Sequence, residues 1–196
     1  MSRSTMTSLI QTVRGLTQAG TAEYTAGTVV YWSDDQIQEV LDRHRYEIRE
    51  ETLQGFPVNA GGGSVQWRDY QSAYRWYETS DNGTARFIVQ DSTGGTVTSW
   101  TSQYQNGLIT FNQNTRGTVY QLTGFAYDVY GAAADIWTQK GAQYAVKIDF
   151  STDNHQVKRS HIMANIDKMI QRYTAMSGVP YQSSNVATIY RGDAAC

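Results

Sequence analysis

One stretch decides the fold: Ser33-Asp34-Asp35-Gln36-Ile37-Gln38-Glu39-Val40-Leu41. A serine followed three positions later by a glutamine forms a capping box, in which each side chain satisfies a backbone amide of the other residue. The two aspartates occupy the first turn, where the helix dipole favours negative charge. One stripe at helical spacing then holds Ile37, Val40, Leu41, His44 and Ile48. The stretch therefore predicts an amphipathic helix with one face in a core.

Three further helices are predicted around this one. The first spans about 5–16, after a cap at Ser4 or Thr5. Another runs from Phe125 to near Ile148 and contains a series of small residues, 131–134, that lets a neighbouring helix approach closely. The last begins at Ser160 and is stopped by Gly178 and Pro180. A single helical bundle is the simplest way to bury four apolar stripes.

Between the second and third helices the pattern changes to strands and turns. Gly61-Gly62-Gly63 reads as a hinge, and Asn106-Gly107 is a hairpin signal because these residues tolerate positive φ. Aromatic and β-branched residues are frequent in the segments 74–78, 85–90, 97–104, 108–111 and 118–122. The region predicts an antiparallel meander of five or six strands.

The predicted fold class is therefore α+β, with a four-helix bundle, an inserted antiparallel β-meander domain and an extended C-terminal tail. The bundle takes residues 1–60 and 123–178, the inserted β domain 61–122, and the tail 179–196. The segment 21–31 reads as an irregular loop.

Composition indicates a surface that other subunits cover. Charged residues are 17% of the 196 residues, against roughly 25% in ordinary soluble domains. The chain has 14 Tyr and 5 Trp, and Arg outnumbers Lys; Tyr, Trp and Arg are the residues that protein interfaces favour. The net charge of −2 argues against a dedicated nucleic-acid binder, which carries a clustered basic surface.

The single cysteine, Cys196, excludes an intrachain disulfide and a four-cysteine zinc site. No apolar run approaches the roughly 18 residues of a membrane span, and the amino terminus lacks the pattern of a secretory signal. We expect the protein to stay in the compartment where it is made, without a membrane partner.

Signals for catalysis are weak. The glycines at 61–63 lack the lysine of a phosphate-binding loop, no serine lies in a nucleophile-elbow pattern, and the terminal Cys196 is a poor nucleophile. His155 and His161 match no known metal-ligand spacing, and polar turn residues are the preferred interpretation over a metal site. We expect no enzyme activity, no cofactor and no metal.

An aromatic cluster in the β region is the feature best suited to a ligand: Trp67, Tyr70, Tyr74, Trp76 and Tyr77. A carbohydrate-binding module displays such rings on one face. The alternative, which we favour, is that the rings pack the core of the β region or its contact with a neighbouring subunit.

Three stretches in a fixed order resemble tailed-bacteriophage head-tail connector (adaptor) proteins. They are 32–45, which contains the capping box; the alanine-rich helix 127–137; and 147–151 followed by 157–160 and the last helix. The resemblance covers most of the chain outside the β region. The β region itself departs from compact adaptors, which pass more directly between the second and third helices.

The resemblance implies a structural virion protein of the phage neck, made in the host cytoplasm. Its implied partners are copies of itself in a ring, commonly a dodecamer, with the portal protein and a downstream neck or tail protein. Genomic DNA would pass through the channel without specific binding. Tail residues expected to contact the portal or a neighbouring subunit are Tyr181, Val186, Ile189, Tyr190 and Arg191. The alternative function is a carbohydrate-binding or decoration virion protein that uses the aromatic-rich β region.

Overall fold

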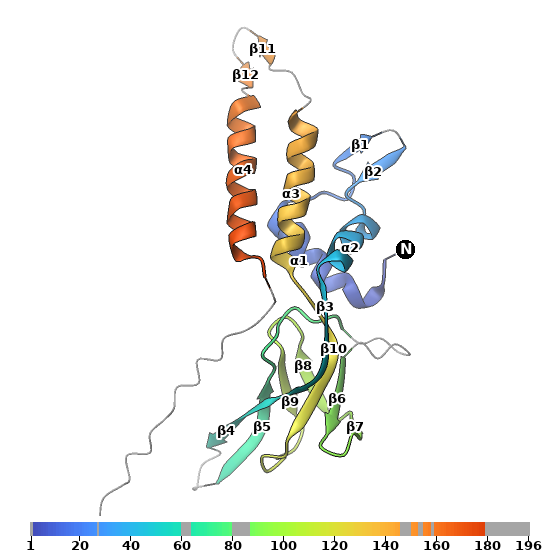
Figure 1. Ribbon diagram of the computed structural model, residues 1–196, viewed down its shortest axis with the longest axis vertical. Helices are drawn as coiled ribbons and strands as arrows, with labels where there is room; N and C mark the ends of the chain where they lie inside the picture. Colours follow the sequence, from blue (N-terminus) through green and yellow to red (C-terminus); the bar gives the residue numbers. More distant parts are fainter. Residues whose placement is uncertain are drawn as a thin grey trace, which may run out of the picture.

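A computed structural model describes residues 2–26, 28–59, 64–79, 87–145, 150–152, 155–157 and 159–178. The chain is elongated, with helices at one end and β-strands at the other (Figure 1). The fold is α+β, as the sequence predicts, and all its strand pairs are antiparallel. No helix in the described part of the chain is long and apolar enough to cross a membrane.

Three helices from distant parts of the sequence share one core. They are α1 (Thr7–Thr17), which follows a 3-10 turn at Ser4–Met6, α2 (Asp34–Arg43) and α3 (Val129–Ala145). The shared core contains Met6, Leu9, Ile10, Val13, Trp32, Ile37, Val40, Leu41, Val129, Ala132 and Ile136. The apolar stripes on the two sides of the β region therefore meet, as the sequence predicts.

The capping box of α2 is confirmed. The Gln36 amide donates to Ser33 Oγ at 3.3 Å, and the Ser33 amide donates to Gln36 Oε1 at 2.9 Å. The helix nevertheless ends at Arg43, with His44 as its C-terminal cap. The prediction that Ile48 belongs to the helical stripe is wrong, because Ile48 lies in a strand and is buried in the β core.

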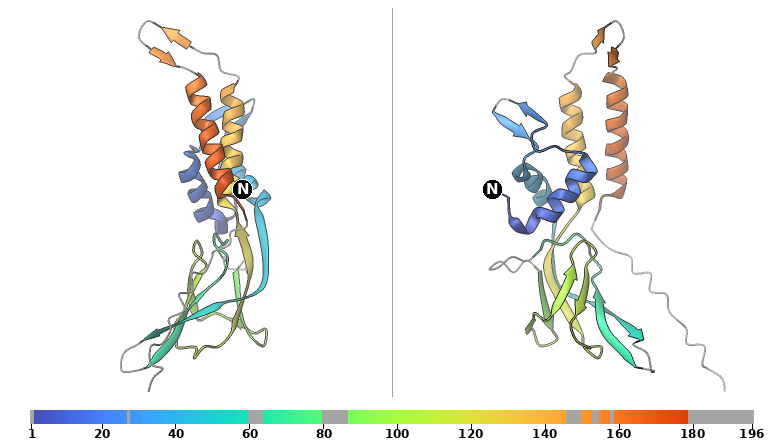
Figure 2. Two further views of the ribbon diagram at one scale, coloured as in Figure 1. Left: turned by 60° about the vertical axis from the view of Figure 1, so that its left-hand side comes forward. Right: turned by 180° about the vertical axis from the view of Figure 1, so that it is seen from behind.

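The structure does not clearly show the predicted four-helix bundle. α4 (Arg159–Met176) lies beside α3 in both Figure 1 and Figure 2, and these two helices pack together. Ala133 and Ala134 are buried against Tyr173, so the small residues of α3 do let a helix approach closely. The core shared by α1, α2 and α3 does not include α4, which lies against α3 and the end of α1 at Leu16.

Eight strands form two four-stranded sheets. They are β3 (Arg45–Thr52), β4 (Gln54–Asn59), β5 (Val65–Gln71), β6 (Phe87–Asp91), β7 (Thr96–Val97), β8 (Trp100–Gln103), β9 (Leu108–Phe111) and β10 (Tyr120–Tyr127). The strand orders are β3-β10-β6-β7 and β4-β5-β9-β8. A simple meander is therefore a wrong prediction, since β10 pairs between β3 and β6.

Side chains from both sheets meet in a second core. Tyr70 and Phe111 from one sheet contact Tyr120 from the other, with ring centroids 5.3 and 4.3 Å away. β10 alternates buried and partly buried residues, as a strand with one face in a core does. Leu53, between β3 and β4, is buried where the chain passes from one sheet to the other.

The predicted boundaries of the β region need correction. Strands begin at Arg45 rather than at 61 and continue to Tyr127 rather than 122. The segment 74–78 is not a strand and contributes only isolated bridges, such as Tyr77 to Ala126. The strand predicted at 108–111 is confirmed, and Gly107 before it has φ of +67°, as the Asn-Gly turn requires.

Two short hairpins extend from the helical end (Figure 2). β1 (Tyr24–Ala26) pairs with β2 (Val29–Tyr31), where an irregular loop was expected. β11 (Phe150–Thr152) and β12 (His155–Val157) connect α3 with α4.

Candidate functional site

A buried carboxylate joins the helical end to the β end. Glu78 has no exposed side-chain surface and accepts hydrogen bonds from Thr5 Oγ1 at 2.5 Å, Tyr127 OH at 2.6 Å and Arg3 Nε at 3.0 Å. Arg3 also makes an ion pair with Asp42 of α2 at 2.6 Å. A buried charge is tolerated only when it is paired and hydrogen-bonded. The contacts that satisfy Glu78 therefore hold Arg3 and Thr5 against both the helical end and the β end of the molecule.

The surroundings of the Glu78 carboxylate shift the pKa values of two neighbouring side chains, Arg3 and Tyr127. The hydrogen bond to Asp42, with the nearby charge of Glu78, raises the pKa of Arg3, although partial burial opposes the shift. Burial, together with the hydrogen bond to Glu78, raises the pKa of Tyr127 far above its ordinary value. Arg3 therefore stays charged and Tyr127 stays a neutral donor, which is the arrangement of a structural junction.

A second carboxylate, Asp128, connects the start of α3 with the end of α4. Asp128 Oδ1 accepts from the amides of Tyr130 at 3.1 Å and Gly131 at 2.9 Å. Asp128 Oδ2 accepts from Ser177 Oγ at 2.6 Å and from the Gly178 amide at 2.8 Å. Asp128 thereby fixes the positions of Ser177 and Gly178 relative to the start of α3.

Lys140 anchors the base of the β1–β2 hairpin. It is 3% exposed and its Nζ donates to the Thr17 carbonyl at 3.0 Å, at the end of α1. It also makes an ion pair with Glu23 at 2.7 Å, immediately before β1. A cation at the C-terminal end of a helix is favoured by the dipole, so one side chain of α3 holds both α1 and the hairpin.

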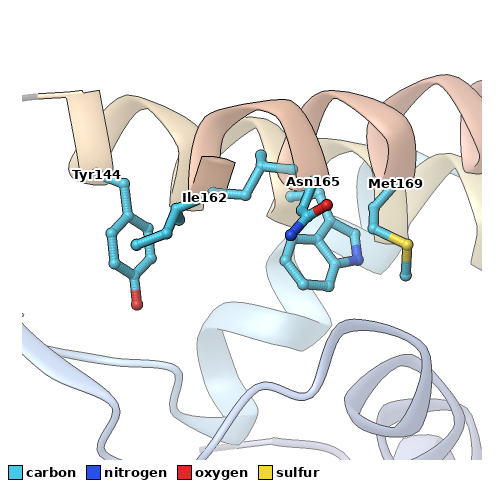
Figure 3. Close-up of a pocket in the computed structure, with 6 residues that line it drawn as sticks. Tyr144, Ile162, Asn165 and Met169 are labelled. Carbon is cyan, nitrogen blue, oxygen red and sulfur yellow. The ribbon is translucent and has the colours of Figure 1, made fainter. Parts of the chain in front are cut away.

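An open apolar groove runs between α3 and α4. It has a volume of about 220 Å³ and is lined by Trp137, Tyr144, Ile162, Asn165, Ile166 and Met169. Figure 3 shows the labelled side chains of Tyr144, Ile162, Asn165 and Met169 along this groove. Ligand pockets usually measure roughly 300–1,000 Å³, so this groove fits the side chains of a protein better than a larger organic ligand.

The five aromatic residues predicted as a contact surface do not share one exposed face. Tyr70 and Tyr77 are buried in the β core, and Tyr74 packs against it. Trp76 packs instead against the helical core, with its ring edge-on to Tyr130 at 6.4 Å. Trp67 is half-buried in β5. Only part of the cluster is therefore accessible on this chain.

The predicted tail contacts, Tyr181, Val186, Ile189, Tyr190 and Arg191, lie outside the described residues. His161 is exposed at the start of α4. Among the residues that the structure describes, no group of three or more His, Cys, Asp or Glu side chains is placed to hold a metal ion.

Sequence reasoning missed Glu78, Asp128 and Lys140. Asp128 carried a signal, since an aspartate directly before an apolar helical stretch is a good N-cap. Glu78 and Lys140 carried no such signal, because their partners lie far away in the sequence. Thr5 is 73 positions from Glu78, and Thr17 is 123 positions from Lys140.

Comparisons with protein-family models, with curated proteins and with solved structures give no match to this chain.

Proposed function

We propose that this chain is a structural virion protein, a head-to-tail connector subunit that forms a ring between portal and tail in a tailed-phage neck. The observation that carries the proposal is the open apolar groove between α3 and α4. An apolar groove of this size suits a contact with another protein.

The placement of the adaptor-like stretches supports the proposal. Stretch 32–45 contains α2, 127–137 contains the first half of α3, and 157–160 leads into α4. These stretches all lie at the helical end of the molecule. The resemblance thus concerns one contiguous part of the structure, to which the β unit is added.

The proposed partners follow from the resemblance: copies of the same chain in a dodecameric ring, together with the portal and a downstream neck or tail protein. Asp128 fixes the position of Gly178, the residue before the predicted tail 179–196 in the sequence. We assign this segment to contacts with the portal or a neighbouring subunit. Genomic DNA passes through the ring without a specific site.

The carbohydrate-binding or decoration alternative gains no support from the aromatic placement. Such a module needs several rings on one accessible face, and Tyr70 and Tyr77 are buried. A glycan array tests the alternative directly. Binding that is lost on Trp67→Ala would replace the connector proposal, whereas an array without signal removes the alternative.

Co-expression with the portal protein of the same genome tests the connector proposal. Size-exclusion chromatography with light scattering is expected to give one defined complex with many copies of the chain per portal ring. Immunoelectron microscopy of intact particles is expected to place antibodies against the chain at the neck. Absence of both the complex and the neck labelling would overturn the proposal.

A further inference from the structure

We propose that residues 72–79, here named the strap, are a strained segment that supports α4 on α3, and that α4 loosens from α3 when the strap relaxes. The strap follows β5 directly in the sequence. The inference goes beyond the proposed function and concerns the chain alone. Its tests need no portal protein, so their outcome is separate from that of the connector proposal.

The backbone of the strap is hydrogen-bonded to two parts of the β unit. The Trp76 amide donates to the Gln105 carbonyl at 3.1 Å, and the Trp76 carbonyl accepts from the Tyr127 amide at 3.1 Å. Tyr77 forms an isolated bridge with Ala126. The strap therefore contacts both the turn between β8 and β9 and the end of β10, the strand that leads into α3.

Two carboxylates hold the ends of the strap. At its start, Glu51 of β3 accepts hydrogen bonds from Ser72 Oγ at 2.7 Å and from the Ala73 amide. Near its end, the buried Glu78 carboxylate is held by the three donors described above. The residues between these two points must therefore span a distance that their neighbours determine.

The strain is located in the middle of the strap. Trp76 has φ of +64°, in the left-handed region that is unfavourable for a bulky L-residue. Within the part of the chain that the structure describes, the buried Nε1 of Trp76 and Nε of Arg75 have no hydrogen-bond partner. Strained backbone persists only where surrounding contacts impose it, and it is frequent in segments that switch conformation. The contacts at the two ends impose it here, so freeing one end is expected to relax Trp76.

The strained residues reach α4 through one tyrosine of α3. The Trp76 ring is edge-on to Tyr130, and the Arg75 guanidinium lies over the Tyr130 ring at 5.8 Å. Tyr130 is in turn stacked with Tyr173 of α4, with centroids 6.3 Å apart and an angle of 12° between the rings. Because α4 lies outside the core of the other three helices, loss of support at Tyr130 is expected to loosen α4 first.

Glycine and alanine at position 76 measure the strain. Trp76→Gly and Trp76→Ala both remove the ring, but only glycine tolerates positive φ. In urea unfolding, the folding equilibrium constant of Trp76→Gly is expected to be roughly tenfold greater than that of Trp76→Ala. Tyr74, also in the strap, does not have positive φ and provides the control pair, in which Tyr74→Ala is expected to be better than Tyr74→Gly by roughly two- to fivefold. Equal constants for the two variants at position 76, or a greater one for alanine, overturn the inference.

Glu51→Ala tests whether the held start of the strap imposes the strain. The change removes the acceptor of Ser72 and Ala73, so Trp76 is expected to relax. The advantage of Trp76→Gly over Trp76→Ala is then expected to fall from roughly tenfold to within about twofold. Glu47→Ala, an exposed change on the same strand, is the control and leaves the advantage as it was. An undiminished advantage in the Glu51→Ala background overturns the inference.

Hydrogen exchange measures the coupling between the strap and α4. Trp76→Ala and Trp76→Gly are expected to speed exchange in the part of α4 around Tyr173 by roughly fivefold or more and to leave α2 unchanged. Trp76→Phe keeps a ring against Tyr130 and is expected to retain the protection of α4 within about twofold. Trp67→Ala removes a half-buried ring from β5 and is the control that leaves α4 unchanged.

Tyr173→Ala is the reciprocal variant, and it is expected to fold because its ring lies outside the core of the other three helices. Coupling between two sites acts in both directions. The variant is therefore expected to speed exchange of the Trp76 and Tyr77 amides, which donate to the carbonyls of Gln105 and Tyr104. Unchanged protection of α4 in both ring-free variants at position 76, or unchanged strap amides in Tyr173→Ala, refutes the coupling.

Discussion

Ser177, one residue beyond α4, donates a hydrogen bond to the carboxylate of Asp128 at 2.6 Å, across 49 positions of sequence. The same carboxylate accepts from the Gly131 amide in the first turn of α3 at 2.9 Å. One side chain therefore determines where one helix begins and where the other ends. Because α4 lies outside the core of the other three helices, its position depends strongly on such individual contacts.

Ser177→Ala removes only the contact with the end of α4. We expect it to lower the free energy of unfolding by about 1 kcal/mol and to speed hydrogen exchange in the last turns of α4. Asp128→Ala also removes the N-cap of α3, and its expected cost is about 2–3 kcal/mol. Urea unfolding with exchange mass spectrometry measures both. Equal costs for the two variants would contradict this division of roles.

Substitutions at Glu78 test the junction between the helical end and the β end of the molecule. Glu78→Gln turns one acceptor oxygen into a donor that faces Thr5, Tyr127 or Arg3, so we expect a loss of about 2–3 kcal/mol in the free energy of unfolding. Tyr127→Phe leaves the carboxylate with one donor fewer and is expected to cost about 1–2 kcal/mol.

The two changes share a hydrogen bond, so the double variant is expected to depart from additivity by at least about 0.5 kcal/mol. Glu47→Gln, on the exposed side of β3, is the control and should stay within about 0.5 kcal/mol of the unmodified chain. Strict additivity in the double-mutant cycle would show that the junction is not one hydrogen-bonded unit.

Two tyrosines give stability a dependence on alkaline pH. Burial, with the neighbouring charge of Glu51, raises the pKa of Tyr77, and burial with the hydrogen bond to Glu78 raises that of Tyr127. In the unfolded chain both ionise near the ordinary value of 10.0. Above that pH the unfolded state releases protons that the folded state keeps, so stability is full below about pH 10 and falls as the pH rises further.

An absorbance titration of tyrosinate measures this effect. In the folded chain at least Tyr77 and Tyr127 are expected to ionise only with unfolding, and Tyr77→Phe or Tyr127→Phe each removes one such group. Ionisation of all 14 tyrosines near the ordinary value, without loss of structure, would contradict the prediction.

The helices could be predicted because their signals are local. The capping box at Ser33 and the apolar stripes lie within one or two turns of each other, and the structure places helices there. The strand β3 was not predicted from the sequence. Arg45–Thr52 is rich in charged residues, and Ile48 keeps the helical spacing of the apolar stripe that precedes it in α2. Only the long-range pairing with β10 makes this segment a strand.

The candidate site was predicted less well than the fold. The aromatic cluster was identified as a group of large rings, but burial divides it between two cores: Tyr70 lies in one and Trp76 against the other. The sequence could not show this division, because it depends on which segments pack between the sheets. The groove between α3 and α4 was equally hidden, since its walls come from 137–144 and 162–169.

Two glycines in helices are expected to respond to alanine in opposite directions. In an open helix Gly→Ala stabilises by about 0.5–1 kcal/mol. Gly15, in α1, meets this condition, because nothing lies within 4 Å of the position that its Cβ would take. At Gly131 the new Cβ would lie 2.7 Å from Asp128 Oδ2 and 2.7 Å from His44 Nδ1. The cap of α3 must then shift, and we expect Gly131→Ala to destabilise by about 1–3 kcal/mol. Thermal unfolding of both variants checks the pair, and stabilisation by Gly131→Ala would show that the contacts around Asp128 are looser than the structure has them.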